Sequence, residues 1–398
     1  MKNSQTKIWV VSELFYPETI STGYIMSEIT KSLNNEFEVE VICGSLFYEK
    51  NNDHKYYIDL PFLVNRINAV EYNKNHFISR LIGNLKISWK MFLLMKQKIP
   101  SNSQVLMVSN PIFLIWLTSL LTTKRGWKIK LIVHDVFPEN VGSIKKINVL
   151  GRFFLPSVKY LFDVAFSKMD TLILLGRDMK DVFLKKVNNV QLQIIENWAD
   201  VQNISPKHNF SNKEFIFIYA GNFGRVQGIE TLLESLNYIK NPKFSFIFIG
   251  SGASQNLIDD FIKNSKNNFI QRLPWQEREK QNDFLNEATI GVVSLAKGMY
   301  GLGVPSKFYN LLAAGKPILY IGPKNSELHL VIKESKIGWF AEAGNVTEIS
   351  NIFEEIINTG ESILREYSSN ARILAETMYS KKIILSKFNK LFCHENIN

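Results

Sequence analysis

Residues 303–317 read Gly-Val-Pro-Ser-Lys-Phe-Tyr-Asn-Leu-Leu-Ala-Ala-Gly-Lys-Pro, and no other stretch indicates as much about the fold. A loop containing Pro305 leads into a short apolar helix, and Gly-Lys-Pro ends that helix before a strand at 318–321. The N-terminus of a helix exposes unpaired N–H groups and the positive end of the helix dipole, so it binds anions such as phosphate. Ser306 and Lys307 lie in the first turn, where Lys307 adds a positive charge. The stretch therefore predicts an anion site; the alternative is an ordinary connection whose lysine points to solvent.

Short β-branched runs alternate with helical patterns along nearly the whole chain, which is typical of α/β folds with parallel sheets. The strands expected in the first half are 7–12, 37–43, 104–109, 130–134, 171–175 and 191–195. Those expected in the second half are 215–220, 244–250, 269–273, 290–295, 317–321 and 338–341. The same architecture is thus expected twice.

The chain has 398 residues, 45% of them apolar, which exceeds what one hydrophobic core usually serves. The polar stretch 199–214 is the expected linker between two domains. We expect an N-terminal domain at 1–205, a C-terminal domain at 206–379, and a last helix at about 380–398 that packs back on the first domain.

Cysteine content and apolar runs bear on the location of the protein. Cys43 and Cys393 lie far apart with no metal-ligand spacing, which favours a reducing compartment. The N-terminus lacks the basic head and long apolar stretch of a secretory signal. The longest apolar run, 111–121, is shorter than the roughly 20 residues of a spanning helix. We therefore expect a cytoplasmic protein that does not span a bilayer.

The net charge of +10 is concentrated in one quarter of the chain. Between residues 60 and 160 there are 15 Lys or Arg and three acidic residues, a difference of +12. Within this part, apolar residues recur at helical spacing from Ile78 to Leu93, with Arg80, Lys86 and Lys90 among them. This pattern is typical of an interfacial helix on an anionic membrane surface. The alternative is a core-facing helix with a solvated basic face; no nucleic-acid-binding motif accompanies the charge.

Ligands of open parallel sheets bind beyond the C-terminal ends of the strands, so the residues that follow each strand are candidates. After 215–220 come Gly221, Asn222, Gly224, Arg225 and Gln227. Glycines allow the backbone to approach a ligand closely, and an arginine can reach a phosphate. Ordinary turn chemistry explains the same glycines equally well.

Two further strand ends of the second half carry candidates. Gly252 precedes a helix after strand 244–250, and Pro274 and Trp275 follow strand 269–273. The tryptophan ring could frame a flat base, although a packed tryptophan is the plainer interpretation.

The first half also offers candidates at strand ends. Thr22 and Gly23 would bring the backbone near a ligand. His134, Asp135 and Glu139 follow strand 130–134, and such a cluster could transfer protons or recognise sugar hydroxyls. A lone histidine is usually structural, but its position at a strand end favours a functional role.

Together these segments resemble the GT-B glycosyltransferases of family 4, in particular the branch that builds O-antigen and capsule chains with acetamido-deoxysugars. The segments that carry the resemblance are 15–18 with Gly23, 133–139, 196–200, 219–228 and 304–317. The resemblance covers nearly the whole chain. It implies two Rossmann-like, doubly wound parallel-sheet domains that face a central cleft. It also implies a retaining transfer from a UDP-sugar held by the second domain to an acceptor held by the first.

The sequence departs from the family pattern at charged positions. Where the family has an Arg and a Lys after the first strand of the second domain, this chain has Asn222 and Gln227. Where the family has two glutamates, it has Leu302 and Asn310. Arg225 lies close enough in sequence to compensate, and Lys307 would then be the main cation for the diphosphate. Asn310 can bond a ribose or sugar hydroxyl but cannot act as a base.

The resemblance thus implies catalytic roles for His134, Asp135 and Lys307. The residues expected to bind the donor are Gly23, Gly221, Asn222, Gly224, Arg225, Gln227, Gly252, Pro274, Trp275, Val304, Pro305, Ser306, Lys307 and Asn310. No Asp-x-Asp motif stands in a site-like position, so we expect no metal and no cofactor besides the UDP-sugar substrate. The expected acceptor is a polyprenyl-diphosphate-linked saccharide at the cytoplasmic face of the inner membrane.

Two other functions remain open from the sequence. A nucleotide-sugar 2-epimerase has the same two-domain architecture and would need no acceptor. A non-catalytic subunit that binds a sugar nucleotide would explain the missing charges and glutamates.

Overall fold

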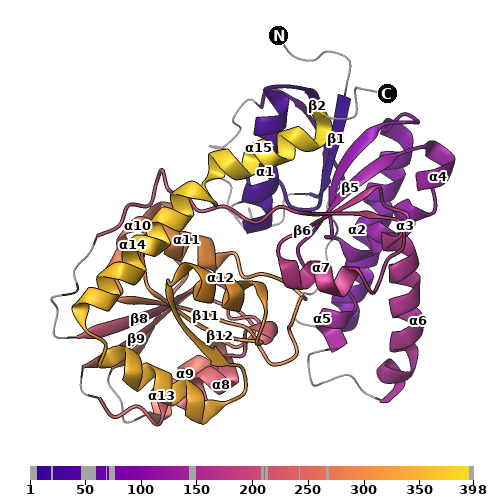
Figure 1. Ribbon diagram of the computed structural model, residues 1–398. Coiled ribbons are helices and arrows are strands. Elements are labelled where there is room, and N and C mark those ends of the chain that lie inside the picture. The colour runs from indigo at the N-terminus through magenta and orange to yellow at the C-terminus, as the bar shows by residue number, and fades with distance from the viewer. Residues whose placement is uncertain are drawn as a thin grey trace.

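The computed structural model describes residues 7–18, 21–45, 60–68, 70, 77–142, 149–207, 210, 214–241, 243–265 and 269–393 (Figure 1). Two parallel sheets form two α/β domains, and each sheet has helices on both faces. The predicted α/β fold with two doubly wound parallel sheets is confirmed.

The first sheet has the strand order β3-β2-β1-β4-β5-β6-β7, and all of its pairings are parallel. Its strands are β1 (Lys7–Ser12), β2 (Glu38–Cys43), β3 (Leu63–Arg66), β4 (Gln104–Val108), β5 (Lys128–Val133), β6 (Thr171–Leu174) and β7 (Gln191–Ile194). One face packs on α1 (Ser21–Asn34) and α15 (Lys381–Cys393). The other packs on α2 (Phe77–Lys98), α3 (Ile112–Ser119) and α6 (Val149–Phe166). The short helices α4 (Thr122–Arg125), α5 (Glu139–Gly142) and α7 (Arg177–Phe183) complete this part.

The second sheet has the order β10-β9-β8-β11-β12-β13, also parallel. Its strands are β8 (Phe215–Ala220), β9 (Phe244–Ile249), β10 (Ile270–Leu273), β11 (Ile290–Ser294), β12 (Ile318–Gly322) and β13 (Gly338–Glu342). Its helices are α8 (Ile229–Leu236), α9 (Gln255–Asn264), α10 (Gln281–Glu287), α11 (Lys307–Ala313), α12 (Glu327–Ser335), α13 (Val346–Ile357) and α14 (Glu361–Thr377). Phenylalanines dominate one of its cores, and the rings of Phe217, Phe246 and Phe353 contact one another there.

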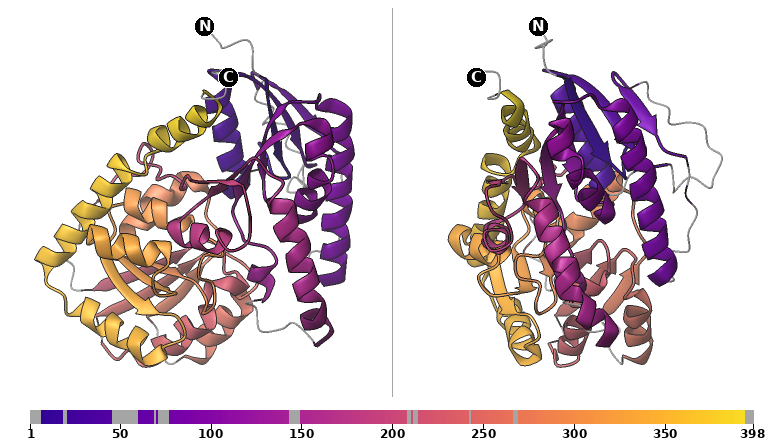
Figure 2. Two further views of the ribbon diagram at one scale, coloured as in Figure 1. Left: turned by 45° about the vertical axis from the view of Figure 1, so that its right-hand side comes forward. Right: turned by 90° about the vertical axis from the view of Figure 1, so that its right-hand side faces the viewer.

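The strand order of each sheet reverses between two neighbouring strands, β1 and β4 in the first and β8 and β11 in the second. Ligands of such sheets bind at the carboxyl ends of the strands near this point. The carboxyl ends of the two sheets meet: Asp135, after β5, forms a β-bridge with Gly303, after β11. The long C-terminal helices α14 and α15 run from the second domain back to the first (Figures 1 and 2).

Strand β3 was not predicted from the sequence; it is a half-exposed strand at the edge of the sheet and pairs with β2. Each of the other strands overlaps an expected range, with ends that differ by at most two residues. In the described parts of the chain, no helix is both long and apolar enough to cross a membrane.

Candidate active site

Glycines bring three segments of the second domain together beyond β8 and β9. Gly221 (φ +132°) follows β8, and a Cβ atom there would lie 3.3 Å from Cε of Lys307. A Cβ at Gly250 would lie 2.0 Å from the carbonyl oxygen of Gly221, and one at Gly252 would lie 2.5 Å from Oδ1 of Asn222. The predicted residues Gly221, Asn222, Gly252 and Lys307 therefore lie together, and a side chain at Gly250 or Gly252 would clash with its neighbours.

The ammonium group of Lys307 lies over an aromatic ring rather than beside an anion. Its Nζ is 3.4 Å from the centroid of the Tyr219 ring, an attractive cation–π contact. The Nζ is buried, and it has no hydrogen-bond partner among the described residues. Burial lowers the pKa of Lys307 well below its ordinary value, because the charged form loses hydration. A bound anion would supply the missing counter-charge.

Lys307 is also the first residue of α11, as the sequence predicted for an anion site. The N–H groups of Phe308 and Tyr309 bond to the carbonyl oxygens of Pro305 and Ser306, both at 3.3 Å. These bonds leave Ser306 and Lys307 to offer N–H groups to a ligand at the start of the helix.

The loop after β8 holds its predicted residues in different environments. Gln227 is fixed, since its side chain accepts a hydrogen bond from the Tyr219 hydroxyl (3.1 Å) and its carbonyl accepts one from Ser294 (2.6 Å). Asn222 and Arg225 are exposed, and Gly224 lies between them in sequence, where a Cβ would make a tight contact of 3.2 Å with Nδ2 of Asn222. Arg225 begins the 3₁₀ turn η2 (Arg225–Gln227) and has no ion-pair partner in the described part of the chain.

His134 and Asp135 lie where the two domains meet. Nδ1 of His134 is 3.5 Å from the Thr22 hydroxyl, while its Nε2 is buried without a partner among the described residues. Burial lowers the pKa of His134 to about 4, so the ring is neutral near pH 7. Asp135 touches solvent, yet the surrounding protein desolvates its carboxyl and raises its pKa.

Residues 303–306, which begin the stretch with the predicted donor-binding residues, contact the first domain directly at this junction. Gly303 pairs with Asp135 in the β-bridge, and the Ser306 hydroxyl lies 3.4 Å from that of Ser21. Val304 and Pro305 are buried between these contacts. The structure thus brings His134 and Asp135 next to the segment that carries Lys307.

Four predicted residues are not tied to this cluster by direct contacts. The Asn310 amide donates to Oε1 of Gln281 (2.9 Å), so its side chain already has an internal partner. Pro274 and Trp275 are exposed, the latter by 58%. A Cβ at Gly23 would lie 2.8 Å from the carbonyl oxygen of Glu18, so close packing of the protein itself accounts for this glycine.

Several residues that shape this region were not predicted from the sequence. Tyr219 lies inside β8, whereas ligand-binding residues are expected after the end of a strand. The Arg278 guanidinium, from the second domain, stacks 3.5 Å from the centroid of the Tyr24 ring in α1, and its Nε is buried without a partner in the described residues. Arg177 and Asp178 follow β6 and contact the second domain. Arg177 and Asp178 could have been found, because they follow a predicted strand.

Comparisons with known proteins show the family of the chain. The family model described as "Glycosyl transferases group 1" matches residues 200–373. The chain is 31% identical to "Probable glycosyltransferase WbjE" of Pseudomonas aeruginosa over 403 residues, which covers 96% of each chain.

Two solved structures share the fold at low sequence identity. Sucrose-phosphate synthase of Thermosynechococcus elongatus superposes with a TM-score of 0.74 at 12% identity, covering 98% of both chains. HepE of Anabaena, solved in complex with UDP-glucose, superposes with a TM-score of 0.67 at 12% identity, covering 97% of this chain and 98% of that one. Both have the two-domain GT-B architecture. This chain belongs to the group 1 family of glycosyltransferases.

Proposed function

We propose that this glycosyltransferase transfers a sugar from a UDP-sugar to a polyprenyl-diphosphate-linked saccharide, with retention of configuration at the anomeric carbon. The observation that carries the proposal is the buried ammonium of Lys307, which has no counter-ion among the described residues and lies beside the glycines after β8. A nucleoside diphosphate is the anion that a glycine-rich turn and a nearby helix start would accommodate. That HepE was solved with UDP-glucose supports a UDP-sugar as the donor.

Lys307 and the loop after β8 are assigned the task of stabilising the leaving UDP. As the bond between the anomeric carbon and the UDP oxygen breaks, negative charge grows on the diphosphate. Lys307 and the N–H group of Ser306 are the donors proposed to balance that charge, as preorganised dipoles and cations do in other enzymes. Arg225, exposed on the same loop, is proposed to add a second cation.

No carboxylate nucleophile is assigned, because Leu302 and Asn310 occupy the positions where the family resemblance implies glutamates. The acceptor hydroxyl would attack from the face that the UDP leaves, and its proton would pass to an oxygen of the leaving diphosphate. His134, neutral near pH 7, and Asp135 are proposed to orient the sugar or the acceptor. With Lys307 as the cation, we expect turnover to be unchanged by EDTA.

A peripheral membrane contact is proposed through α2. This helix is apolar on two faces: Ile87, Met91 and Met95 pack on the sheet, fully buried. On its outer side Leu85 (46% exposed) and Trp89 (50% exposed) face solvent, and Leu81, Ile82 and Leu93 are similarly exposed. Only one stripe of a soluble helix needs to be apolar, so the outer stripe supports a second partner of low polarity.

Helix α6 extends this surface. It packs on the same face of the first sheet as α2, with α3 in contact with both (Figure 2). Phe153 is 77% exposed and Tyr160 is 68% exposed, and Phe154 and Leu161 are also exposed. With Lys86 and Lys159 exposed nearby, the combination of aromatic and basic side chains suits an anionic lipid surface, where a polyprenyl-linked acceptor would be embedded.

The donor sugar is proposed to be an N-acetylated deoxyhexosamine or another N-acetylhexosamine, and the product part of a bacterial surface polysaccharide. This narrower assignment is supported by the resemblance to transferases of acetamido-deoxysugars that segments 15–18 with Gly23, 133–139, 196–200, 219–228 and 304–317 carry together.

The decisive experiment is a donor screen that measures UDP release in the presence of membrane extract. We expect release with one or a few UDP-N-acetylhexosamines, and a loss of about 100-fold in kcat/KM for Lys307→Met. Lys263→Met, at an exposed position of α9, is the matched control and should behave as wild type. Full turnover by Lys307→Met would refute the diphosphate assignment.

The same screen separates the other functions. Donor binding without UDP release in the presence of acceptor would indicate a non-catalytic subunit. Interconversion of UDP-N-acetylglucosamine without acceptor, followed by NMR, would indicate a 2-epimerase.

A further inference from the structure

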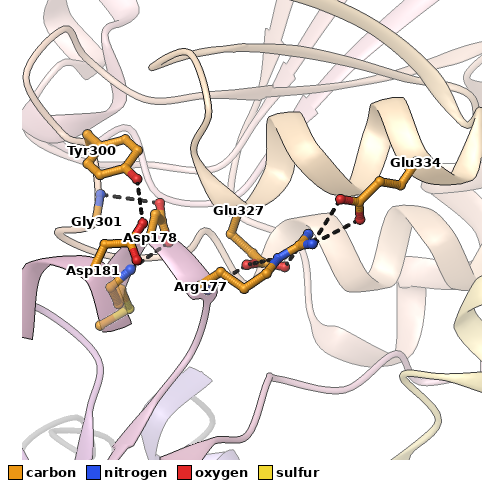
Figure 3. A network of polar contacts seen from close by, with 8 residues as sticks. Arg177, Asp178, Asp181, Tyr300, Gly301, Glu327 and Glu334 are labelled. Atoms are coloured by element: carbon orange, nitrogen blue, oxygen red, sulfur yellow. Dashed lines mark hydrogen bonds and ion pairs between the residues drawn. The ribbon is translucent and has the colours of Figure 1, made fainter. Parts of the chain in front are cut away.

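The start of α7 ties the first domain to the second through a cluster of charged residues (Figure 3). The guanidinium of Arg177 contacts Glu327 through Nε (3.0 Å to Oε2) and Nη2 (3.2 Å to Oε1). Its Nη1 lies 2.9 and 3.0 Å from the two carboxylate oxygens of Glu334. The backbone N–H of Arg177 also donates to Oε2 of Glu327 (2.6 Å). Helix α7 is therefore bonded to α12 across the domain boundary.

Asp178, the next residue, accepts bonds from three separate segments. Its side chain is 2% exposed; Oδ1 accepts the N–H of Met179 (2.8 Å) and Oδ2 accepts that of Gly301 (3.2 Å). A backbone hydrogen bond from Glu327, at the start of α12, adds a third. A carboxylate at the N-terminus of a helix is also favoured by the helix dipole. One carboxylate thus joins α7, α12 and the segment that contains Gly301.

The segment with Gly301 leads directly into residues 303–317, the stretch that contains the predicted donor-binding residues. Residues 295–306 form neither helix nor strand, and the first domain holds them at several points. The Tyr300 hydroxyl donates to Oδ2 of Asp181 (2.9 Å), and the carbonyl of Leu302 accepts the N–H of Val136 (3.0 Å). Gly301 has φ +67°, and a Cβ there would lie 2.5 Å from the carbonyl oxygen of Asp178. The approach of α7 therefore requires a glycine at this position.

We propose that Asp178 is a positioning residue for the donor: by holding Gly301 it sets the place of residues 304–307, and so of Lys307 relative to the loop after β8. This proposal rests on the proposed function, because it takes that cluster to be the site of the UDP-sugar. The hydrogen bond from Gly301 to a charged acceptor is stronger than one to a neutral acceptor. The charge on Asp178 therefore matters as well as its shape.

The surroundings of Asp178 show that this charge costs stability. Burial raises the pKa of Asp178 to about 6, and the nearby carboxylate of Glu327 raises it further in the same direction. The other ionisable groups around it are Arg177 and Glu334 towards α12, Tyr300 and Asp181 beside Gly301, and Tyr320 in β12. Because the folded-state pKa exceeds the ordinary 3.8, the stabilising contribution is full below about pH 3.8 and is lost as the pH rises through 6. A neutral asparagine would avoid this cost, but it has one acceptor oxygen for the two N–H groups that the carboxylate accepts, so it would leave one of them without its acceptor.

The test compares wild type with Asp178→Asn, using calorimetric binding of UDP-N-acetylglucosamine between pH 5 and 8. We expect wild-type affinity to fall about tenfold as the pH drops through 6 and Asp178 is protonated. Asp178→Asn should bind about tenfold more weakly at pH 7.5 and should lack the loss of affinity on acidification through pH 6. A UDP-sugar has no group of its own that titrates in this range.

Two further variants make the result unambiguous. Asp178→Glu, which keeps the charge, should bind more tightly than Asp178→Asn at pH 7.5. Glu361→Gln removes an exposed carboxylate of α14 and should leave binding unchanged. Wild-type affinity and pH profile in Asp178→Asn would overturn the proposal, as would an equally weak affinity in Asp178→Glu and Asp178→Asn at pH 7.5. Failure of the wild type to bind the UDP-sugar at any pH would instead refute the proposed function.

Discussion

At the scale of single residues, Lys307 is a cation in the wrong surroundings for a structural role. Its ammonium is buried over the Tyr219 ring, and the cation–π contact replaces only part of the lost hydration. The pKa of Lys307 is lowered because the lost hydration is not fully replaced. A diphosphate would favour the charged form and raise the pKa again.

Donor binding should therefore be accompanied by proton uptake. In the pH range where free Lys307 is partly neutral, UDP-N-acetylglucosamine should bind with a proton, and its affinity should fall as the pH rises. Calorimetry in two buffers with different ionisation enthalpies measures the number of protons taken up. In Lys307→Met the buffer dependence should disappear. Equal heats in both buffers for wild type would contradict the expected protonation.

Single residues of the site also differ in whether the sequence alone predicts them. Gly221, His134 and Lys307 were predicted because each stands at a strand end or a helix start, where chemistry gathers in α/β folds. Asp178 follows β6 in the same way, but an acidic residue in the first turn of a helix is common without any function. The contact between Tyr219 and Lys307 joins residues 88 positions apart, and no local pattern predicts which ring a lysine will meet.

At the scale of elements, α2 shows that hydrophobic periodicity can predict a helix without showing which of its faces is buried. The sequence indicated an apolar stripe through Leu81, Leu85 and Trp89, and left open whether it faces the core or a membrane. In the structure this stripe is exposed, while Ile87, Met91 and Met95 form the core face. Both stripes have helical spacing, so the pattern predicted the helix but could not tell which side meets the sheet.

The membrane proposal is tested on these exposed side chains. Trp89→Glu in α2 and Phe153→Glu in α6 each place a charge where an apolar ring would enter the lipid interface. Each should weaken flotation with phosphatidylglycerol vesicles about tenfold or more, given the free energy of burying an aromatic side chain. High salt should also reduce binding of the wild type.

The control for this experiment is Tyr238→Glu, since Tyr238 is 61% exposed but lies in the second domain. Its flotation should match that of wild type. Salt-independent flotation, or equal loss in all three variants, would argue against a docking surface on α2 and α6.

At the scale of the whole molecule, the sequence predicted two sheets but not how they are held together. Alternating strands and helices are local patterns, so the architecture could be predicted, including the order of its elements along the chain. The domain boundary instead depends on pairs such as Arg177 with Glu327, 150 positions apart. The edge strand β3 was missed for a related reason, because its four half-exposed residues, Leu63–Arg66, lack the buried pattern of the central strands.

The ion pair between Arg177 and Glu327 at this boundary joins two side chains of unequal exposure. Glu327 has a side chain only 8% exposed, whereas that of Arg177 is 42% exposed. Removing the arginine leaves a buried carboxylate without its bidentate partner, which costs more than breaking a surface pair but less than breaking a fully buried one. We expect Arg177→Met to lower the free energy of unfolding by about 2 kcal/mol. The double variant Arg177→Met/Glu327→Gln should recover part of that loss, because no unpaired charge remains buried.

Calorimetric melting measures both changes, and Arg365→Met is the matched control. Arg365 pairs with Glu361 on the surface of α14, where both side chains are about half exposed, at 55% and 48%. Its replacement should change the stability by less than about 1 kcal/mol. If Arg177→Met melted like this control, the ion pair would contribute little to stability. The packing around Gly301 and Gly303 would then be what holds the two domains in their arrangement.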